Sequence, residues 1–234
     1  MLILYYILLY VRNKMPLEFN PPTLSIFHTF KTKKDQLTGE ALRQRSIISL
    51  LATEKNSATR TRTAISQSIG KKNGIVWKNI YSGIFRDLDE ILIPLGIVKE
   101  AGSLPLLRGP KALQEKGIPF YELTNEGLLV ALSIDESSGN SQILDEFLSK
   151  AEIKEKSFRN TINILAKISP KFVYLIFEIY VKAYCNGQLD NLLPFDVQNL
   201  KNLSAKYLEL EGELLNGFMS LSKRDKNSIL AFFS

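Results

Sequence analysis

The chain has 234 residues, 45% of them hydrophobic, and a formal net charge of +6 at pH 7. This apolar content excludes wholesale disorder, and the length suits one large domain or two small ones. A single cysteine and a single histidine exclude an internal disulfide and a metal site built from Cys and His, so we expect a reducing, cytoplasmic location.

The first eleven residues, MLILYYILLYV, are almost wholly apolar. They are shorter than the roughly 20 residues of a membrane-spanning helix, and they lack the basic start and cleavage site of a signal peptide. Three interpretations stay open: residues 1–14 are not translated because synthesis begins at Met15, the segment packs as an N-terminal element, or it is a weak membrane anchor. We favour the first two and expect no membrane contact. Residues 1–38 as a whole are interpreted as an N-terminal arm, extended where prolines and lysines gather.

Three helices are expected next. Thr38 is a suitable N-cap for a helix over residues 39–56. A shorter helix over residues 57–70 would be capped by Thr59 or Thr61 and ended by Gly70. The third helix, within residues 75–96, is the clearest because apolar residues recur along it every three or four positions. These residues are Ile80, Ile84, Leu88, Ile91 and Leu92.

Two short strands are expected after the third helix. Residues 97–103 begin with a β-branched pair, and residues 120–123 resume a strand pattern beyond a basic loop over residues 104–119. Thr124 is then placed to cap a helix over residues 125–134. Strand, basic loop and strand form the layout of a wing.

Three helices followed by a basic two-stranded wing resemble the winged helix-turn-helix family of archaeal and bacterial transcription regulators, over residues 39–133. Two motifs carry the resemblance. In YELTNEG (121–127) the last wing strand reads Tyr-x-Leu-Thr before a helix that contains glycine, and in DLDEILIPLGIVKE (87–100) a leucine-rich helix end leads through Leu-Gly to the first wing strand. GKKNGIVW (70–77) is longer than the turn that the family usually has there. The resemblance implies DNA binding.

Charge and polarity favour the same function. The stretch from Lys55 to Arg86 holds seven basic residues and no Asp or Glu, which suits a phosphate duplex. We predict that polar residues on the third helix read base edges, that basic residues near the helix ends hold phosphates, and that the wing reaches the neighbouring backbone or minor groove. The readers are Lys78, Asn79, Ser82 and Arg86, the phosphate contacts are Arg60, Arg62, Lys71 and Lys72, and the wing contacts are Arg108 and Lys111. The competing interpretation is a solvated face that contacts proteins.

No catalytic motif is present, so we predict a protein that is not an enzyme and that holds no cofactor and no metal. His28 lies beside Phe27 and is interpreted as a packed or surface residue. Carboxylate pairs such as Asp87 with Glu90 are interpreted as exposed helix faces rather than metal sites. Trp77 and Tyr81 are assigned to the core in preference to stacking on sugars.

Residues 135–141 are interpreted as a linker, and residues 142–234 as a helical domain for dimerisation or interaction. Ser169 and Pro170 begin an apolar helix that continues to Cys185, and we expect it at the centre of a bundle, with its aromatic residues forming core in preference to a ligand pocket. An apolar stripe then recurs at three- and four-residue spacing. It comprises Leu200, Leu203, Tyr207, Leu210, Leu214, Phe218 and Leu221. We expect the apolar helix and a second chain to cover this stripe together.

The sequence thus predicts a mainly α fold, in which a winged helix (three helices plus a two-stranded β wing) is followed by an α-helical bundle. The expected function is a DNA-binding transcription regulator, a homodimer through its C-terminal helices, with double-stranded DNA as its partner. The alternative is a winged-helix protein-interaction module in a larger assembly, without sequence-specific DNA binding.

Overall fold

The computed structural model describes residues 22–72, 77–105, 117–134, 140–150 and 156–233. Within these ranges the helices are α2 (Gly39–Thr53), α3 (Arg62–Lys72), α4 (Trp77–Arg86), α5 (Asn125–Ile134), α6 (Asn140–Lys150), α7 (Lys156–Ile168), α8 (Pro170–Cys185), α9 (Val197–Ser220) and α10 (Lys223–Phe233). Two short helices, η1 (Ser57–Arg60) and the π-helix η2 (Asp87–Leu92), precede strands β1 (Val98–Leu104) and β2 (Ile118–Leu123), which pair antiparallel. The predicted fold class is confirmed: the chain is mainly helical, with a two-stranded antiparallel sheet after the first helices.

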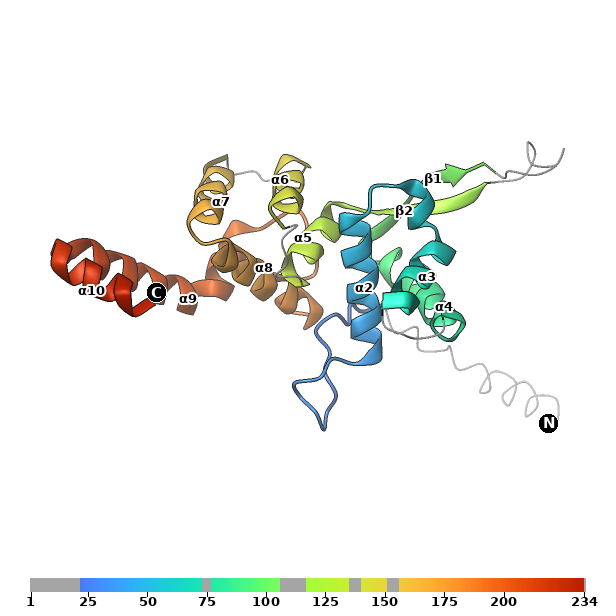
Figure 1. Ribbon diagram of the computed structural model, residues 1–234, viewed down its shortest axis with the longest axis horizontal. Helices are drawn as coiled ribbons and strands as arrows, with labels where there is room; N and C mark the ends of the chain where they lie inside the picture. Colours follow the sequence, from blue (N-terminus) through green and yellow to red (C-terminus); the bar gives the residue numbers. More distant parts are fainter. Residues whose placement is uncertain (1–21, 73–76, 106–116, 135–139, 151–155, 234) are drawn as a thin grey trace, which may run out of the picture.

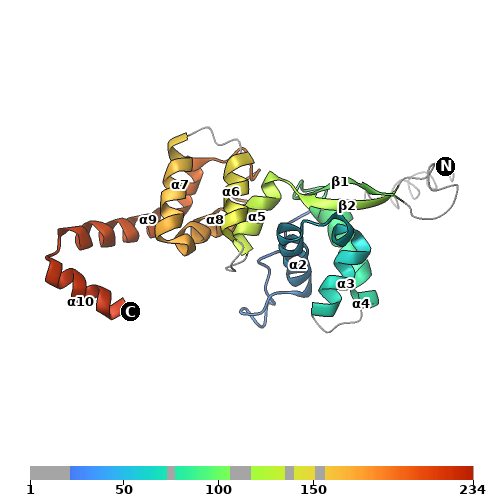
Figure 2. The same cartoon turned by 45° about the horizontal axis from the view of Figure 1, so that its top comes forward.

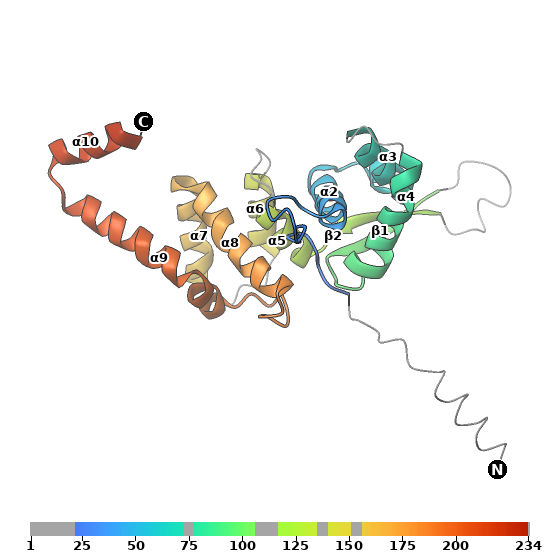
Figure 3. The same ribbon diagram turned by 90° about the horizontal axis from the view of Figure 1, so that it is seen from below.

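The molecule is elongated, with the sheet and α10 at opposite ends (Figure 1). Helices α2, α3 and α4 pack together next to the sheet, and α5 leads from the sheet into the helices that follow (Figures 1 and 2). Helix α9 leaves these helices at its far end, and α10 follows after a sharp turn (Figure 3). None of the described helices is both long and apolar enough to cross a membrane.

The first helices begin as predicted but end elsewhere. The Thr38 side chain caps α2 by accepting the Ala41 N–H at 3.2 Å, and α2 ends at Thr53, earlier than expected. The predicted second helix divides into η1 and α3, and Thr61 caps α3 by accepting the Ala64 N–H at 3.3 Å. Gly70 does not end α3, which runs on to Lys72; its φ is not positive, so it is an ordinary helical residue.

The third predicted helix becomes α4 and η2. Ile84, Leu88 and Leu92 are fully buried, as the apolar spacing predicted. The helix widens at its C-terminal end, where the Ile93 N–H donates to the Leu88 carbonyl five residues back, and Gly96 then turns the chain at a φ of +70°. The interpretation of Asp87 as exposed was wrong: its side chain is fully buried.

The sheet is fixed to both of its neighbouring helices. Val98 pairs with Leu123 and Leu104 with Ile118, with an irregularity between Glu100 and Gly102. Thr124 caps α5 as predicted, since its hydroxyl accepts the Gly127 N–H at 3.1 Å and donates to the Gly96 carbonyl at 2.5 Å.

Gly127 marks the closest contact between α5 and the start of the sheet. A Cβ atom at Gly127 would lie 2.2 Å from the Ile97 carbonyl oxygen, so only glycine lets α5 lie this close. The close packing of α5 against Ile97 therefore explains why the YELTNEG motif has a glycine at this position.

Residues 22–38 are not an extended arm, which corrects that interpretation for the described part of the segment. Leu24 and Ile26 are buried. The Ser25 N–H donates to the Gln44 side chain at 2.9 Å, and the Arg45 guanidinium donates to the Ile26 carbonyl at 2.8 Å. The segment is therefore held to α2. The apolar start of the chain, residues 1–11, lies outside the described residues.

The C-terminal helices build on α5. Helix α5 packs against α2, α6 and α8, and one continuous core runs from Leu24 to Leu200. Within α8, Phe177 and Tyr180 are buried in that core, so the assignment to core is confirmed for these two. Tyr174 of the same helix is half-buried and lines a pocket, so the assignment is wrong for it. Helix α6 begins at Asn140, two residues before the predicted domain, and residues 135–139 lie outside the described part.

Helix α9 is covered by α8 only at its beginning. Val197, Leu200 and Ser204 are buried, and Leu203 packs against the core. Tyr207, Leu210 and Leu214 are exposed. The expectation that α8 covers the apolar stripe is therefore confirmed for the first turns of α9. It is wrong for Tyr207, Leu210 and Leu214, because α9 projects beyond the end of the bundle (Figure 3).

Candidate nucleic-acid interface

Helix α4 presents a polar face at the sheet end of the molecule. Ser82 and Arg86, four residues apart and therefore neighbours on one side of the helix, are exposed, while Ile84 points into the core. Lys78 and Asn79 lie one turn earlier on α4, and their side chains are outside the described part of the structure. The backbone of α4 thus carries all four predicted base readers on a helix with one buried side.

Arg86 is not free at this face. Its guanidinium lies 3.5 Å from the Glu40 carboxylate of α2 and 3.6 Å from the Asp87 carboxylate, and its side chain is 49% exposed. Asp87 is held in turn by the Arg43 guanidinium at 2.8 Å. This network ties the end of α4 to α2, and Gly83 leaves room for it, since a Cβ there would lie 2.8 Å from the Arg43 Nε.

Arg60 and Arg62 were predicted as phosphate contacts. Their side chains instead contact acids and aromatic rings of the same chain. Arg62 forms an ion pair with Asp89, and its guanidinium carbon lies 4.4 Å from the centre of the Phe85 ring. Arg60 is 3.8 Å from the Glu122 carboxylate and lies over the Phe120 ring, with only 14% of its side chain exposed. Both arginines join the start of α3 to the sheet and to the end of α4, which corrects their assignment to the DNA-facing surface.

Tyr121 lies beside Arg62. Its ring is fully buried, 5.4 Å from the Arg62 guanidinium carbon. Burial raises the pKa of the Tyr121 hydroxyl, and the Arg62 charge opposes the rise. The hydroxyl is therefore neutral at physiological pH, and packing against this ring explains the position of Arg62.

Three lysines lie around the end of α3 and the start of α4. Lys71 is exposed and makes no ion pair with any residue that the structure describes, whereas Lys55 pairs with Glu146 at 3.4 Å. Lys72 ends α3 and Lys78 lies in the first turn of α4, although the side chains of both are outside the described part. We call Lys71, Lys72 and Lys78 the turn lysines. The turn itself, residues 73–76, is also not described.

Two residues that the sequence analysis missed extend this surface. Thr63 and Gln67 are exposed on α3 and, with Lys71, follow each other at four-residue intervals. Such spacing places all three on one side of the helix. The signal was available in the sequence as polar residues opposite the buried Ile65 and Ile69.

The wing is described in its strands only. Lys99 and Glu122 are opposite each other in the sheet, with their charged atoms 3.1 Å apart. Arg108 and Lys111, the predicted wing contacts, lie outside the described residues. The positive charge of the described strands is therefore partly compensated within the sheet.

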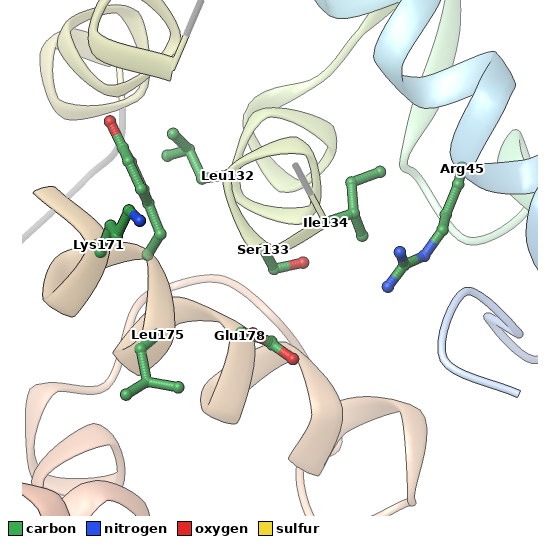
Figure 4. A pocket seen from close by; sticks show the side chains of 8 residues that line it. Arg45, Leu132, Ser133, Ile134, Lys171, Leu175 and Glu178 are labelled. Carbon is green, nitrogen blue, oxygen red and sulfur yellow. The ribbon is translucent and has the colours of Figure 1, made fainter. Parts of the chain in front are cut away.

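A pocket of about 480 Å³ lies on another side of the molecule, between α5, α8 and α2 (Figure 4). Arg45 and Lys171 line its opposite sides, with Ser133 between them. Arg45 already donates to the Ile26 carbonyl, and Glu178 already pairs with Lys182 at 2.5 Å. Since Arg45 and Glu178 have internal partners, we assign no effector to the pocket.

Tyr81 and His28 complete the list of predicted positions. Tyr81 is half-buried, with its ring centre 6.3 Å from that of Phe85. His28 is exposed on the turn that leads to α2. The Trp77 side chain is not among the described ones.

Comparison of the chain with protein-family models, with curated proteins and with solved structures gives no match.

Proposed function

We propose that residues 39–133 bind duplex DNA as a winged helix, with α4 facing the major groove, and that the chain is a transcription regulator. One observation carries the proposal: α4 has an exposed polar side, with Ser82 and Arg86, and packs on α3, where Lys71 is exposed and forms no ion pair with a described residue, near an antiparallel two-stranded sheet. A helix with one buried side and one polar side fits a major groove, whose base edges offer hydrogen-bonding groups.

In this proposal the turn lysines bind phosphates and α4 reads bases. Arg86 has to leave Glu40 to reach a guanine edge. The Arg86 and Glu40 side chains are partly exposed, and an exposed ion pair contributes only about 0–1 kcal/mol, so giving up Glu40 costs little. Arg86 also leaves Asp87, which keeps its closer ion pair with Arg43. Until DNA is bound, Glu40 holds the arginine close to its working position.

The test of phosphate binding uses the full chain and fluorescence anisotropy on labelled duplexes over a range of salt concentrations. Affinity is expected to fall steeply with salt, because each neutralised phosphate releases counterions. The double variant Lys71→Ala/Lys72→Ala is expected to weaken binding to all duplexes alike and to flatten the log–log salt slope by about 2.

The matched control is Lys201→Ala/Lys206→Ala, which removes the same charge from exposed positions on α9. It is expected to leave the salt slope unchanged. If both double variants flattened the slope equally, the effect would come from net charge and the turn lysines would lose their assigned role.

The test of base reading compares Asn79→Ala and Arg86→Ala on a selected duplex and its single-base variants. A lost base contact is expected to cost about 1–3 kcal/mol at one base position while leaving affinity for random duplexes nearly unchanged. Uniform weakening on every sequence would remove α4 from the role of reader.

A protein-interaction module is the second candidate, and the pairing of the arginines favours it. Glu40, Asp89 and Glu122 neutralise much of the charge that the sequence places in residues 55–86. Phe85 is 42% exposed beside Arg86, as an apolar contact with a protein would need. Weak DNA binding that is flat between low and moderate salt would favour this candidate.

A further inference from the structure

An aromatic ring lies on the polar side of α4. Phe85 is 42% exposed and directly precedes Arg86 in the chain. At about 100° per residue, Phe85 lies about 60° from Ser82 in one direction around the helix, and Arg86 lies about 40° from Ser82 in the other. The fully buried Ile84 is on the opposite side. The Phe85 ring therefore belongs to the same surface as the proposed base readers.

Arg62 supports the Phe85 ring from the interior. The Arg62 guanidinium carbon lies 4.4 Å from the centre of the Phe85 ring and 5.4 Å from the centre of the buried Tyr121 ring. Arg62 is itself fixed by its ion pair with Asp89. The centre of the Tyr81 ring is 6.3 Å from that of Phe85. The Phe85 ring thus combines a supported position with an exposed part, as a contact with an external group requires.

The base edges in a major groove are polar except for one group. They present hydrogen-bond donors and acceptors, and the C5 methyl group of thymine is the apolar exception. A phenyl ring gains from the removal of apolar surface from water, whereas covering a donor or acceptor without a hydrogen bond is unfavourable. On a helix that faces a major groove, the thymine methyl group is therefore the group that the Phe85 ring fits.

We propose that Phe85 contacts the methyl group of a thymine, close to the base that Arg86 reads, and so makes thymine part of the preferred sequence. The inference rests on the proposed function, in which α4 faces the major groove, and it adds a specificity-determining residue to that function. A protein partner under the second candidate function would use the same exposed ring. Dependence of binding on a thymine methyl group distinguishes the two.

The test removes one methyl group at a time from the DNA. The full wild-type chain selects a duplex from a random pool, and each thymine of this duplex is replaced singly by deoxyuridine, which lacks only the methyl group. Fluorescence anisotropy then measures the affinity. For the wild-type chain, replacement at one or two positions is expected to lower the affinity about fourfold, the effect of burying one methyl group. Replacement at the other positions is expected to change little.

Variants of Phe85 assign the effect to the ring. Phe85→Ala is expected to bind the thymine duplex at least about fourfold more weakly and to lose the difference between thymine and deoxyuridine at that position. Phe85→Leu keeps an apolar side chain and is expected to retain part of the difference. The matched control is Phe30→Ala, which removes a similarly exposed ring, 47%, from the segment before α2. It is expected to behave like the wild type, and circular dichroism checks that each variant is folded.

The outcomes separate this inference from the proposed function. A chain that prefers the selected duplex to random ones, but is indifferent to every thymine methyl group, would overturn the role of Phe85 and leave the proposed function intact. A deoxyuridine effect that persists in full in Phe85→Ala would do the same. A chain without preference for any duplex would overturn both proposals, and the exposed ring would then belong to the second candidate function.

Discussion

The sheet end and the tail end of this molecule differ in whether their charged side chains have partners within the described chain. At the sheet end, Arg60 and Arg62 are bound to acids of the same chain and lie over aromatic rings. At the tail end, Glu211, Lys223 and Arg224 form no ion pair among the described residues. A charged residue therefore indicates an external partner only when the fold has not already supplied an internal one.

Apolar stripes show the same contrast. The stripe of α4 and η2, through Ile84, Leu88 and Leu92, is fully buried, whereas the stripe of α9 is exposed at Tyr207, Leu210 and Leu214. Both have the same three- and four-residue spacing. The two stripes differ in the helices that pack against them. Helices α2 and α3 pack on α4, while α9 runs past the end of α8.

The largest expected effect comes from removing the buried acid at the sheet end. Asp87→Ala leaves the Arg43 guanidinium without its carboxylate in a partly buried site. We expect the free energy of unfolding to fall by about 3 kcal/mol, the lower end for a broken buried ion pair. Urea unfolding measures it. Glu209→Ala, at the exposed tail, is the control and is expected to change stability by less than about 0.5 kcal/mol.

A glycine at each end sharpens the comparison. In Gly127→Ala the new methyl group collides with the Ile97 carbonyl, and we expect a loss of about 1–3 kcal/mol. Gly212→Ala meets no atom within 4 Å and is expected to favour helix formation by about 0.5–1 kcal/mol. Thermal unfolding measures the first change, and hydrogen exchange along α9 measures the second. Equal effects of the two substitutions would contradict the contrast between a packed end and an open one.

Arg62 tests whether an arginine at the sheet end is structural. Arg62→Lys keeps the charge but loses the planar group over Phe85. We expect a loss of about 1–2 kcal/mol in unfolding free energy, since a partly desolvated cation–π contact is worth up to about 2 kcal/mol. A role in phosphate binding alone predicts unchanged stability and reduced DNA affinity, and this result would reinstate Arg62 in the interface.

The smallest effect concerns the ion pair between Lys55, just after α2, and Glu146 of α6. The hydrogen bond from Lys150, followed by the charge of Lys55, lowers the pKa of Glu146, although burial opposes the shift. A lowered carboxyl pKa adds stability above the pKa of the unfolded chain, and this stability is lost as pH falls through the folded pKa. Glu146→Gln is therefore expected to cost about 0.5 kcal/mol at pH 7 and less at pH 3. Urea unfolding at both pH values measures this difference.

Much of the local structure could be predicted from the sequence. Thr38 and Thr124 begin helices where their side chains can accept backbone N–H groups, and the buried faces of α4 and α8 follow from apolar spacing. The strands were predicted within one or two residues at their paired ends. These features depend on residues close together in the chain, so the sequence pattern contains the information needed.

The candidate site was predicted less well because its charges are compensated from a distance. Arg86 pairs with Glu40, and Arg60 pairs with Glu122 from the second strand. A stretch without acids can thus lie among acids once the chain folds. Ser82 and Lys71 remain exposed as predicted, while the side chains of Lys72, Lys78 and Asn79 and the loop with Arg108 and Lys111 stay predictions.

By itself the sequence determined where helices and strands form and which residues share a side, because capping and periodicity act within a few residues. Only the tertiary structure decided which sides are covered and which charges are paired, because burial depends on elements far apart in the chain. Asp87 is the clearest case. From its place on the helix we interpreted it as exposed, but α2 lies against it and Arg43 compensates its charge. The apolar stripe of α9 is the converse, where regular spacing predicted burial and the end of α8 leaves α9 uncovered.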